Sequence, residues 1–368
     1  MKVLHIITRM NTGGPAVFLD HLTNAMSELG AQSTIAYGCC ESNETDYIEN
    51  HEINSKLIKV KTLHRSLNPF DDIRTFFALR QVIKGVKPDL VNTHTSKAGV
   101  LGRIAAKSIN RKIPVVHTYH GHLIYGYFAK SKTIIFTLIE RLLAQFTNAA
   151  VSITKETQTS LQKLKIGKNL EWSVIRLGIP VSSNNSLPSN DGHKLKLLWV
   201  GRFTNIKDPA YAVKVMVELE KISPNRFELS MVGGGELLEQ ITKNTQNLPI
   251  QFLGWVDKPF ENSGYFDLLL LTSKNEGMGL VTLEAANYKK PTVARNVGGV
   301  GEFIKDGVSG LLINNSPAEM ANKMNSLTSE KLNKMGEASY QILVKDFTDK
   351  VMASNYLKLY NFLIKLKP

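Results

Sequence analysis

Cysteine is nearly absent from the chain. Only two of its 368 residues are cysteine, and these are adjacent, Cys39 and Cys40. A disulfide framework needs several cysteines at separated positions, so the sequence excludes one. No spaced set of cysteines and histidines follows the pattern of a zinc site. We therefore expect neither disulfides nor a structural metal.

Long apolar runs are also missing. Nowhere do about 18 apolar residues follow one another, so we expect no membrane-spanning segment. The first ten residues, MKVLHIITRM, contain one early lysine and an apolar run too short and too interrupted for a signal peptide. These absences predict a cytoplasmic protein.

The composition, with 43% hydrophobic and 21% charged residues, is typical of a folded globular protein. At 368 residues the chain is too long for one ordinary core, so two domains are expected. The net charge of +13 indicates an anionic partner: nucleic acid, a phosphorylated small molecule or an anionic membrane surface. Charge alone does not choose among them, and a basic surface that only confers solubility is a further alternative.

Short apolar runs alternate with helical patterns, which is typical of parallel α/β layers. The polar run at 181–193 predicts a linker. We therefore expect two doubly wound domains, joined near residue 185, with a cleft where the carboxyl ends of the two sheets face each other. The expected strands are Val3–Ile7, Ser33–Tyr37, Leu57–Val60, Leu90–Thr93, Val115–Thr118, Ala150–Ile153 and Ser173–Ile175 before the linker, and Leu195–Val200, Glu228–Val232, Ile250–Leu253, Leu268–Leu271, Thr292–Ala294 and Gly310–Ile313 after it.

The segment from Ser273 to Glu302 places Glu276 and Glu284 around a helix start that is broken by glycines. Gly277 and Gly279 remove side chains where a ligand must approach the backbone. The first N–H groups of the following helix lack partners and carry its positive dipole end, which favours a phosphate. Glu284 can accept hydrogen bonds from ribose hydroxyls. For the glutamate spacing alone, an ordinary strand–turn–helix unit with solvated carboxylates is an equal alternative.

Further on, Gly298 and Gly299 follow another expected strand and would let a second turn pass close to the same ligand. Arg202 and Lys207 project from one loop after the strand at 195–200. A guanidinium fork and an ammonium suit a diphosphate. Solvated surface charge is the alternative, and Asp208 could instead pair with either cation.

Two further glycine clusters follow strands. Gly13 and Gly14 would let the first loop lie against a ligand, although the loop lacks the G-x-G-x-x-G fingerprint and a plain tight turn explains it as well. The run from Gly233 to Gly235 is not a phosphate-binding loop of the G-K-[ST] type. A ribose or a base could pack there, and a glycine-rich turn is the alternative.

Three histidines, His117, His120 and His122, crowd into VHTYHGHL at the end of a strand. No acidic residue accompanies them, so we favour one imidazole that binds a sugar hydroxyl over a metal site. The sequence does not indicate which of the three it is. His94 lies at another strand end and could face the same cleft.

The segment from Tyr125 to Phe146 combines aromatic residues, cations and an apolar helix, as membrane-surface helices do. We expect core packing for the face from Ile134 to Leu143. The remaining candidates for contact with lipid are Tyr125, Tyr127, Phe128, Lys130 and Lys132.

Several motifs, in this order and spacing, resemble the retaining glycosyltransferases of family 4, which have the GT-B fold: TGGP, GRFTNIKD, VGGGE, FLGWV, SKNEGMGLVTLEA and KPTVARNVGGVGEFIKDGVSGLL. The segments NTHTSKAGVLGRIAAK and VHTYHGHLIYGYF look like bacterial enzymes that build surface polysaccharides on lipid carriers. The resemblance implies an α/β protein with two Rossmann-like domains facing across a cleft. Residues 1–182 would form the acceptor-side domain and 183–349 the nucleotide-sugar domain, with a helix at 350–368 returning to the first.

The resemblance also implies roles for individual residues. Four would be catalytic: Arg202 and Lys207 as a diphosphate clamp, Glu276 as a sugar-hydroxyl ligand and His120 beside the donor sugar. Other donor contacts would be Gly13 and Gly14 by the diphosphate, Gly233 and Val256 at the base, Gly277 and Met278 in the glutamate motif, Gly279, Leu280 and Val281 through backbone N–H groups, and Glu284 on the ribose. His94 is a candidate on the acceptor side. Two residues depart from the family: Met278 replaces the commoner Phe, and Asp208 replaces the usual Gly.

The implied activity is transfer of a hexose from a nucleotide diphosphate sugar, most commonly linked to UDP, to a hydroxyl of a lipid-linked or polysaccharide-precursor acceptor. The anomeric configuration would be retained, and neither a metal nor another cofactor would be needed. Peripheral contact with an anionic membrane at the inner face of the plasma membrane is expected, and a nucleic-acid partner is not. The rivals are a phosphorylase of the same fold, for which no cofactor lysine is evident, and a non-catalytic nucleotide-sugar-binding protein. The donor sugar and the oligomeric state are not indicated.

Overall fold

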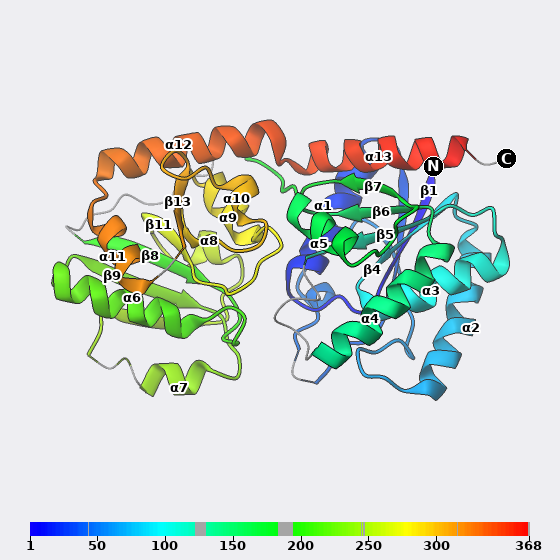
Figure 1. Ribbon diagram of the computed structural model, residues 1–368, viewed down its shortest axis with the longest axis horizontal. Helices are drawn as coiled ribbons and strands as arrows, with labels where there is room; N and C mark the ends of the chain where they lie inside the picture. The colour runs from blue at the N-terminus through cyan, green and yellow to red at the C-terminus, as the bar shows by residue number, and fades with distance from the viewer. Residues whose placement is uncertain are drawn as a thin grey trace. The chain divides into compact units, whose positions relative to one another are not determined.

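The computed structural model describes residues 1–42, 44–121, 130–182, 194–243, 245, 247–314 and 316–366, without the side chains of residues 130–132 (Figure 1). The chain divides into two compact units. The N-terminal unit consists of Met1–Pro180 and Phe347–Pro368, and the C-terminal unit of Val181–Asp346. The sequence prediction placed these two divisions after residues 182 and 349.

The N-terminal unit is built on a parallel sheet of seven strands, in the order β3-β2-β1-β4-β5-β6-β7. Every strand expected before the linker overlaps one of them, because apolar runs bounded by turn residues suit strands that are covered on both faces. The strands are β1 (Lys2–Ile7), β2 (Gln32–Tyr37), β3 (Lys56–Lys59), β4 (Leu90–His94), β5 (Val115–Tyr119), β6 (Ala149–Ser152) and β7 (Glu171–Val174).

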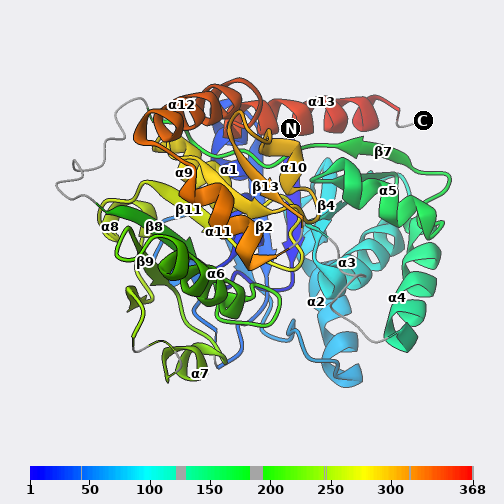
Figure 2. The same cartoon turned by 60° about the vertical axis from the view of Figure 1, so that its left-hand side comes forward.

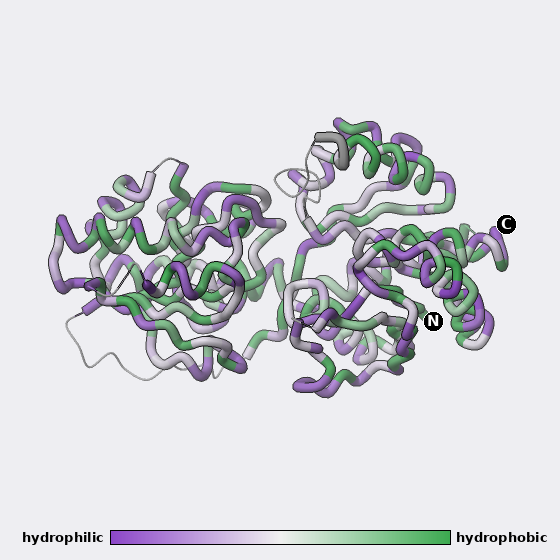
Figure 3. The backbone as a smooth tube through the Cα atoms, turned by 90° about the horizontal axis from the view of Figure 1, so that it is seen from below, coloured by the Kyte–Doolittle hydropathy of each residue, from purple (hydrophilic) through white to green (hydrophobic). Residues whose placement is uncertain are grey.

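Helices cover this sheet, and along the backbone hydrophobic and hydrophilic residues alternate as expected of amphipathic elements (Figure 3). The Asn68 side chain caps α2 by accepting a hydrogen bond of 3.1 Å from the Phe70 N–H. Helix α3 contacts both α2 and α4. The helices are α1 (Gly14–Glu28), α2 (Pro69–Val86), α3 (Ser96–Ile109), α4 (Lys130–Leu143), α5 (Lys155–Lys163) and α13 (Asp349–Lys365), with short 3-10 turns η1 (Tyr47–Glu49) and η2 (Ala144–Phe146).

The last helix, α13, belongs to the N-terminal unit and packs against α1. Its buried tyrosines reach the sheet: the Asn92 side chain donates to the Tyr360 hydroxyl at 2.6 Å, and the Tyr356 hydroxyl lies 3.2 Å from Thr118 Oγ1. At the start of the helix, a Cβ on Gly178 would lie 2.2 Å from the carbonyl oxygen of Thr348. Glycine is therefore required where the returning segment meets the chain.

The C-terminal unit has a parallel sheet of six strands, in the order β10-β9-β8-β11-β12-β13, and all six strands expected after the linker are present. The strands are β8 (Leu195–Val200), β9 (Phe227–Val232), β10 (Ile250–Gly254), β11 (Leu268–Leu271), β12 (Thr292–Arg295) and β13 (Gly310–Ile313). The helices are α6 (Pro209–Ile222), α7 (Leu238–Lys243), α8 (Pro259–Asn262), α9 (Leu280–Asn287), α10 (Val300–Phe303), α11 (Pro317–Asn325) and α12 (Ser329–Asp346).

Both sheets share one topology, in which the chain first winds outward from a central strand and then continues on its other side. The winding direction reverses between β1 and β4 in one unit and between β8 and β11 in the other. This is the doubly wound, Rossmann-like arrangement that the sequence predicted. Such sheets bind ligands at the carboxyl ends of the strands beside the reversal, which points to two loop pairs. No helix in the described ranges is both long and apolar enough to cross a bilayer.

Helix α4 corrects one prediction about packing. Its apolar face was expected in the core, yet Ile134, Ile135, Leu138, Ile139 and Leu142 are exposed. The inner side carries a polar anchor instead. Glu140 is 1% exposed, accepts a hydrogen bond of 2.8 Å from the Arg103 guanidinium, and accepts another of 2.7 Å from the Tyr119 hydroxyl. A buried guanidinium requires a carboxylate, so Arg103 on α3 determines which side of α4 faces inward.

We predict that Glu140→Leu lowers the free energy of unfolding of the N-terminal unit by about 3 kcal/mol or more, because it leaves the Arg103 charge buried and unpaired. Arg103→Met combined with Glu140→Leu should recover part of that loss, since it removes both charges. Urea unfolding followed by intrinsic fluorescence measures both variants. If the double variant is less stable than the single one, Arg103 and Glu140 do not act as a pair.

Candidate functional site

The candidate site of the C-terminal unit is built from two loops beside the point where its sheet reverses. One follows β8 and the other follows β11, and these strands are neighbours. Thr272 Oγ1 donates to the carbonyl oxygens of Lys207 and Asp208 at 3.1 and 3.0 Å, and it accepts from the Trp199 indole at 2.9 Å. The Lys274 N–H donates to the Ile206 carbonyl at 2.8 Å. The two loops are therefore held as one structure.

Across these loops, Lys207 and Glu276 form an ion pair. Ser273 Oγ donates to the same carboxylate oxygen at 2.7 Å. The side chains keep 27% and 10% of their surface exposed, so a ligand can reach both. The structure thus brings together the predicted diphosphate cation and the predicted sugar ligand, and in the free protein each neutralises the other.

Asp208 pairs with neither cation that the sequence suggested. Its carboxylate lies 3.2 Å from Arg295 Nη1 and 3.8 Å from Lys274 Nζ. The Asp208 backbone has φ 49° and ψ 58°, the left-handed conformation that glycine favours and aspartate tolerates better than most residues. This conformation explains why a position usually occupied by glycine accepts aspartate here.

Arg202, by contrast, is exposed, and its guanidinium has no hydrogen-bond or ion-pair partner among the described residues. It lies two residues after β8, in the loop that also holds Lys207. An unpaired guanidinium beside a paired lysine provides a fork for an anion at this edge of the sheet.

Two glycine clusters that were predicted to admit a ligand are used at least in part for packing. A Cβ on Gly298, where φ is 57°, would lie 1.8 Å from the Glu276 carbonyl oxygen, and the Gly299 N–H donates to that oxygen at 3.2 Å. A Cβ on Gly233 would lie 2.0 Å from the Gly201 carbonyl oxygen. These glycines hold the backbones of the Glu276 and Arg202 loops in place.

The predicted base contacts lie at the carboxyl ends of β9 and β10. Val256 is half-buried and packs against the cluster that contains Val232 and Phe260. Trp255, which was not among the predicted site residues, is 60% exposed, and its indole packs against Gly234. An aromatic residue directly after a strand, beside a glycine-rich loop, is the signal that could have identified it.

The start of α9 faces the same end of the sheet. Gly279 has φ 79° and ψ 80°, no side chain caps the helix, and its first turn contains no acidic residue, so its positive end is uncompensated. The backbone N–H groups of Leu280 and Val281 begin this turn. The Met278 side chain is buried, so a ligand can meet this residue and Gly277 only through the backbone. The predicted contact of Met278 with the donor is therefore expected through its backbone and not through its side chain.

Glu284 lies one turn into α9. It is half-buried and has no ion-pair partner among the described residues, and the loss of surrounding water raises the pKa of its carboxyl to about 7. A carboxylate in such a place is stabilised by any ligand that donates hydrogen bonds to it. Paired hydroxyls, as on a ribose, have that capacity.

In the N-terminal unit, three histidines form a chain across the reversal point. His5 Nδ1 lies 3.1 Å from His94 Nε2, and His94 Nδ1 lies 3.0 Å from His120 Nε2. Burial lowers the pKa of His5 to about 3 and that of His120 to about 4, and lowers the pKa of His94 well below its usual value. All three rings are therefore neutral at pH 7, with one donor and one acceptor nitrogen each, and His94 uses both of its nitrogens in the chain.

This chain separates the roles of the predicted histidines. His120 is half-buried, and its Nδ1 is not part of the chain. His94 is completely buried, which corrects its predicted contact with an acceptor or a membrane: it orients His120 instead. His117 is buried against the Thr93 hydroxyl at 2.8 Å. His122 lies outside the described residues, as do Tyr125, Tyr127 and Phe128.

The loop after β1 carries Gly13 and Gly14, and α1 begins there without a side-chain cap. No atom lies within 4 Å of a Cβ built on Gly14, unlike the tightly packed glycines of the C-terminal unit. Packing therefore does not require glycine at this position, and the space beside it is open to a ligand. Among the described residues, no three His, Cys, Asp or Glu side chains are grouped in a way that could hold a metal ion.

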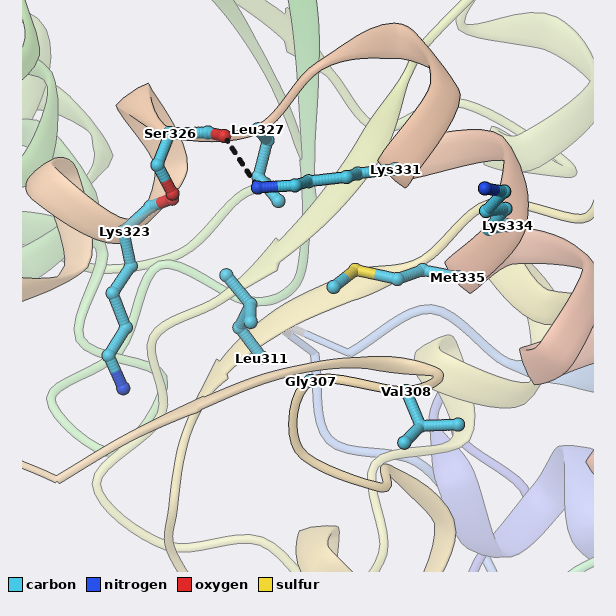
Figure 4. A pocket seen from close by; sticks show the side chains of 9 residues that line it. All are labelled: Gly307, Val308, Leu311, Lys323, Ser326, Leu327, Lys331, Lys334 and Met335. Atoms are coloured by element: carbon cyan, nitrogen blue, oxygen red, sulfur yellow. Dashed lines mark hydrogen bonds between the residues drawn. The ribbon is translucent and has the colours of Figure 1, made fainter.

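A separate hollow of about 340 Å³ lies in the C-terminal unit where the loop before β13 meets α11 and α12 (Figure 4). Its lysines are already engaged: Lys323 lies 3.5 Å from Glu319, Lys334 lies 2.6 Å from Glu330, and Lys331 donates to the Ser326 carbonyl at 3.5 Å. The hollow is at the amino end of β13, opposite the loops described above, and we assign it no ligand.

Comparisons with known proteins agree with this fold. A family model described as Glycosyltransferase Family 4 matches residues 12–182, and one described as Glycosyl transferases group 1 matches residues 194–330. The chain is 29% identical to the Escherichia coli UDP-Gal:alpha-D-GlcNAc-diphosphoundecaprenol alpha-1,3-galactosyltransferase over 84% of each chain. It is 23% identical to the Campylobacter jejuni GalNAc-alpha-(1->4)-GalNAc-alpha-(1->3)-diNAcBac-PP-undecaprenol alpha-1,4-N-acetyl-D-galactosaminyltransferase over 98% of each chain.

Among solved structures, Anabaena Alr3699/HepE in complex with UDP and glucose superposes with a TM-score of 0.79 at 18% identity, over 98% of this chain and 99% of that one. At this identity the likeness concerns the fold. The two family models together span most of the chain, and their order matches the two units. The chain therefore belongs to the glycosyltransferases of the family 4 type, with the GT-B fold.

Proposed function

We propose that this glycosyltransferase moves a hexose from a nucleotide diphosphate sugar, with UDP as the expected nucleotide, to a hydroxyl of a lipid-linked saccharide. The anomeric configuration is retained, and no divalent metal takes part. The observation that carries this proposal is the Lys207–Glu276 pair, which lies in the same two loops as the unpaired Arg202 and directly before the uncapped start of α9.

Charge at this site matches the demands of the reaction. Negative charge develops on the diphosphate as it leaves, and Arg202, Lys207 and the first N–H groups of α9 stabilise it. A phosphate that takes Lys207 also frees the Glu276 carboxylate, which then accepts a hydrogen bond from a sugar hydroxyl. The same-face route, in which a phosphate oxygen helps to deprotonate the acceptor, needs no separate base. In the N-terminal unit, we assign His120 and Gly14 to the donor.

The acceptor is assigned from the relatives. Two of them are named for substrates on diphosphoundecaprenol or PP-undecaprenol, and both align over most of this chain. The net charge of +13 favours an anionic surface such as the cytoplasmic face of a bacterial membrane. We therefore propose a lipid-carried glycan as the acceptor and peripheral attachment to that face.

The first experiment incubates the protein with a panel of UDP-sugars and an undecaprenyl diphosphate saccharide, and measures free UDP and the mass of the lipid product. Release of UDP should depend on the acceptor and persist in excess EDTA. Arg202→Ala should lower turnover about 100-fold while circular dichroism stays unchanged, because one charge-stabilising donor is lost.

Lys221→Ala is the matched control, since that lysine is exposed in the last turn of α6 and, within the described ranges, pairs only with Glu218. Full activity of Arg202→Ala would refute the clamp, and inhibition by EDTA would refute the metal-free mechanism. Nucleotide-sugar binding without turnover, across the panel of acceptors, would favour a non-catalytic binding protein. Product formation that requires inorganic phosphate would favour a phosphorylase.

A second prediction concerns Glu284, whose pKa is raised to about 7 in the free protein. Ribose hydroxyls donate to the ionised carboxylate, so affinity for a UDP-sugar should rise about tenfold between about pH 6 and pH 8 as the proton is lost. The diphosphate of the UDP-sugar does not titrate in this range. Calorimetry measures the affinity, and Glu284→Gln should bind weakly with no such pH dependence.

The raised pKa of Glu284 also affects the free energy of unfolding. Because the pKa of the Glu284 carboxyl is raised, the folded protein favours its neutral form. The stabilisation that is present below the pKa of the unfolded chain is therefore lost as the pH rises through about 7. Glu284→Gln should therefore unfold at higher urea than the wild type at pH 8, and the gain should disappear at pH 5.

A wild-type affinity for the UDP-sugar that is independent of pH would contradict the assignment of Glu284 to the ribose.

A further inference from the structure

Helix α4 turns its apolar side to solvent. Five aliphatic residues keep between 39% and 62% of their surface exposed: Ile134, Ile135, Leu138, Ile139 and Leu142. Helices that cover a sheet normally show the reverse pattern, with polar residues outside. Scattered single apolar residues are ordinary on a protein surface, but five on one side of a helix of 14 residues are not.

The buried side of α4 shows that this orientation is built into the fold. Thr137, Glu140 and Leu143 face inward. Glu140 is held by the Arg103 guanidinium at 2.8 Å and by the Tyr119 hydroxyl at 2.7 Å. Turning the aliphatic side inward would break this buried ion pair, so the exposed row is the stable arrangement of the free protein.

A second exposed row lies on α2 and the residue pair before it. Leu67, Phe70, Ile73 and Phe77 keep between 59% and 88% of their surface exposed. Spacings of three and four residues place the last three on one side of the helix. Helix α3 contacts both α2 and α4 and lies between them (Figures 1 and 2). We call the two rows together the outer apolar surface.

Charge distinguishes among the possible occupants of this surface. The only acidic residue of α4 is the buried Glu140, whereas the helix carries Lys130, Lys132 and Arg141 in its sequence. On α2, Arg74 and Lys84 are exposed, whereas Asp71 and Asp72 in its first turn are half-buried and pair with Arg74 and Lys97. A second copy of the chain would bring the same cations and the same net charge of +13 against them. An anionic bilayer instead offers an apolar interior beneath negative headgroups.

We propose that the outer apolar surface binds an anionic membrane, with α4 and α2 lying in the interface and their apolar side chains inserted below the headgroups. This adds the outward sides of two helices to the predicted contact at Tyr125–Lys132, whose side chains lie outside the described part of the chain. The inference rests on the proposed function at one point, which is the assignment of a lipid-carried acceptor. Membrane binding can be measured without any turnover.

The test is flotation of the full chain with vesicles of phosphatidylcholine alone or mixed with phosphatidylglycerol. Wild-type protein should float with the mixed vesicles. Ile135→Ser/Leu138→Ser/Leu142→Ser should lower the partition coefficient about tenfold or more, and Ile73→Ser/Phe77→Ser should lower it independently. The matched control is Ile222→Ser/Val344→Ser, which removes two exposed aliphatic residues of the C-terminal unit and should float like the wild type.

All variants should keep the wild-type unfolding midpoint and the wild-type rate of UDP release with a water-soluble acceptor. Failure of the wild type to float, or flotation of the α4 variant at the wild-type level, would overturn the proposal. Sedimentation velocity adds a further outcome: a wild-type dimer that the α4 variant converts to monomer would show that the surface joins two copies instead. Flotation without transferase activity would refute the proposed function and leave the membrane surface standing.

Discussion

The ion pair between Lys207 and Glu276 is the interaction on which the candidate donor site depends. It joins the loops after β8 and β11, the two strands beside the reversal of the C-terminal sheet. The surrounding contacts serve to place these two side chains: Thr272 holds the backbone at Lys207, and Gly298 allows the next turn to lie against the backbone of Glu276. In the free protein the pair keeps both charges satisfied, and we propose that a diphosphate displaces the carboxylate and converts the pair into a binding site. Arg202 stands outside the pair, which leaves its charge available from the start.

The N-terminal unit uses buried polar groups in a comparable way. The chain from His5 through His94 to His120 fixes the orientation of the last ring, because a neutral imidazole that donates through one nitrogen must accept through the other. The Arg103–Glu140 pair fixes the orientation of α4. Burying these polar groups has a cost in desolvation. The histidine chain orients the remaining nitrogen of His120, and the Arg103–Glu140 pair orients the row of aliphatic side chains on α4. The proposed donor chemistry and the proposed membrane contact thus depend on separate sets of buried polar contacts.

The sequence was informative wherever local pattern decides structure. Apolar runs between turn residues located the strands of both sheets. The residue types after those strands predicted Arg202, Lys207, Glu276 and Glu284 as site residues, and the structure places Lys207 against Glu276. It was less informative where a distant residue decides. Nothing near Gly233 or Gly298 reveals that each packs against the backbone of another loop, so both were interpreted as space for a ligand. The outward face of α4 depends on Arg103, 37 residues before Glu140, and periodicity alone assigns an apolar row to the core. The buried position of His94 depends likewise on neighbours from other strands.

The central claim is that a nucleoside diphosphate displaces Glu276 from Lys207. A crystal structure of the full chain with UDP tests it most directly. We expect a phosphate oxygen within hydrogen-bond distance of Lys207 Nζ, the Glu276 carboxylate released from that lysine, and the ribose hydroxyls hydrogen-bonded to Glu284. A structure in which UDP binds elsewhere, or in which Lys207 keeps Glu276 as its partner while UDP is bound, would contradict the account.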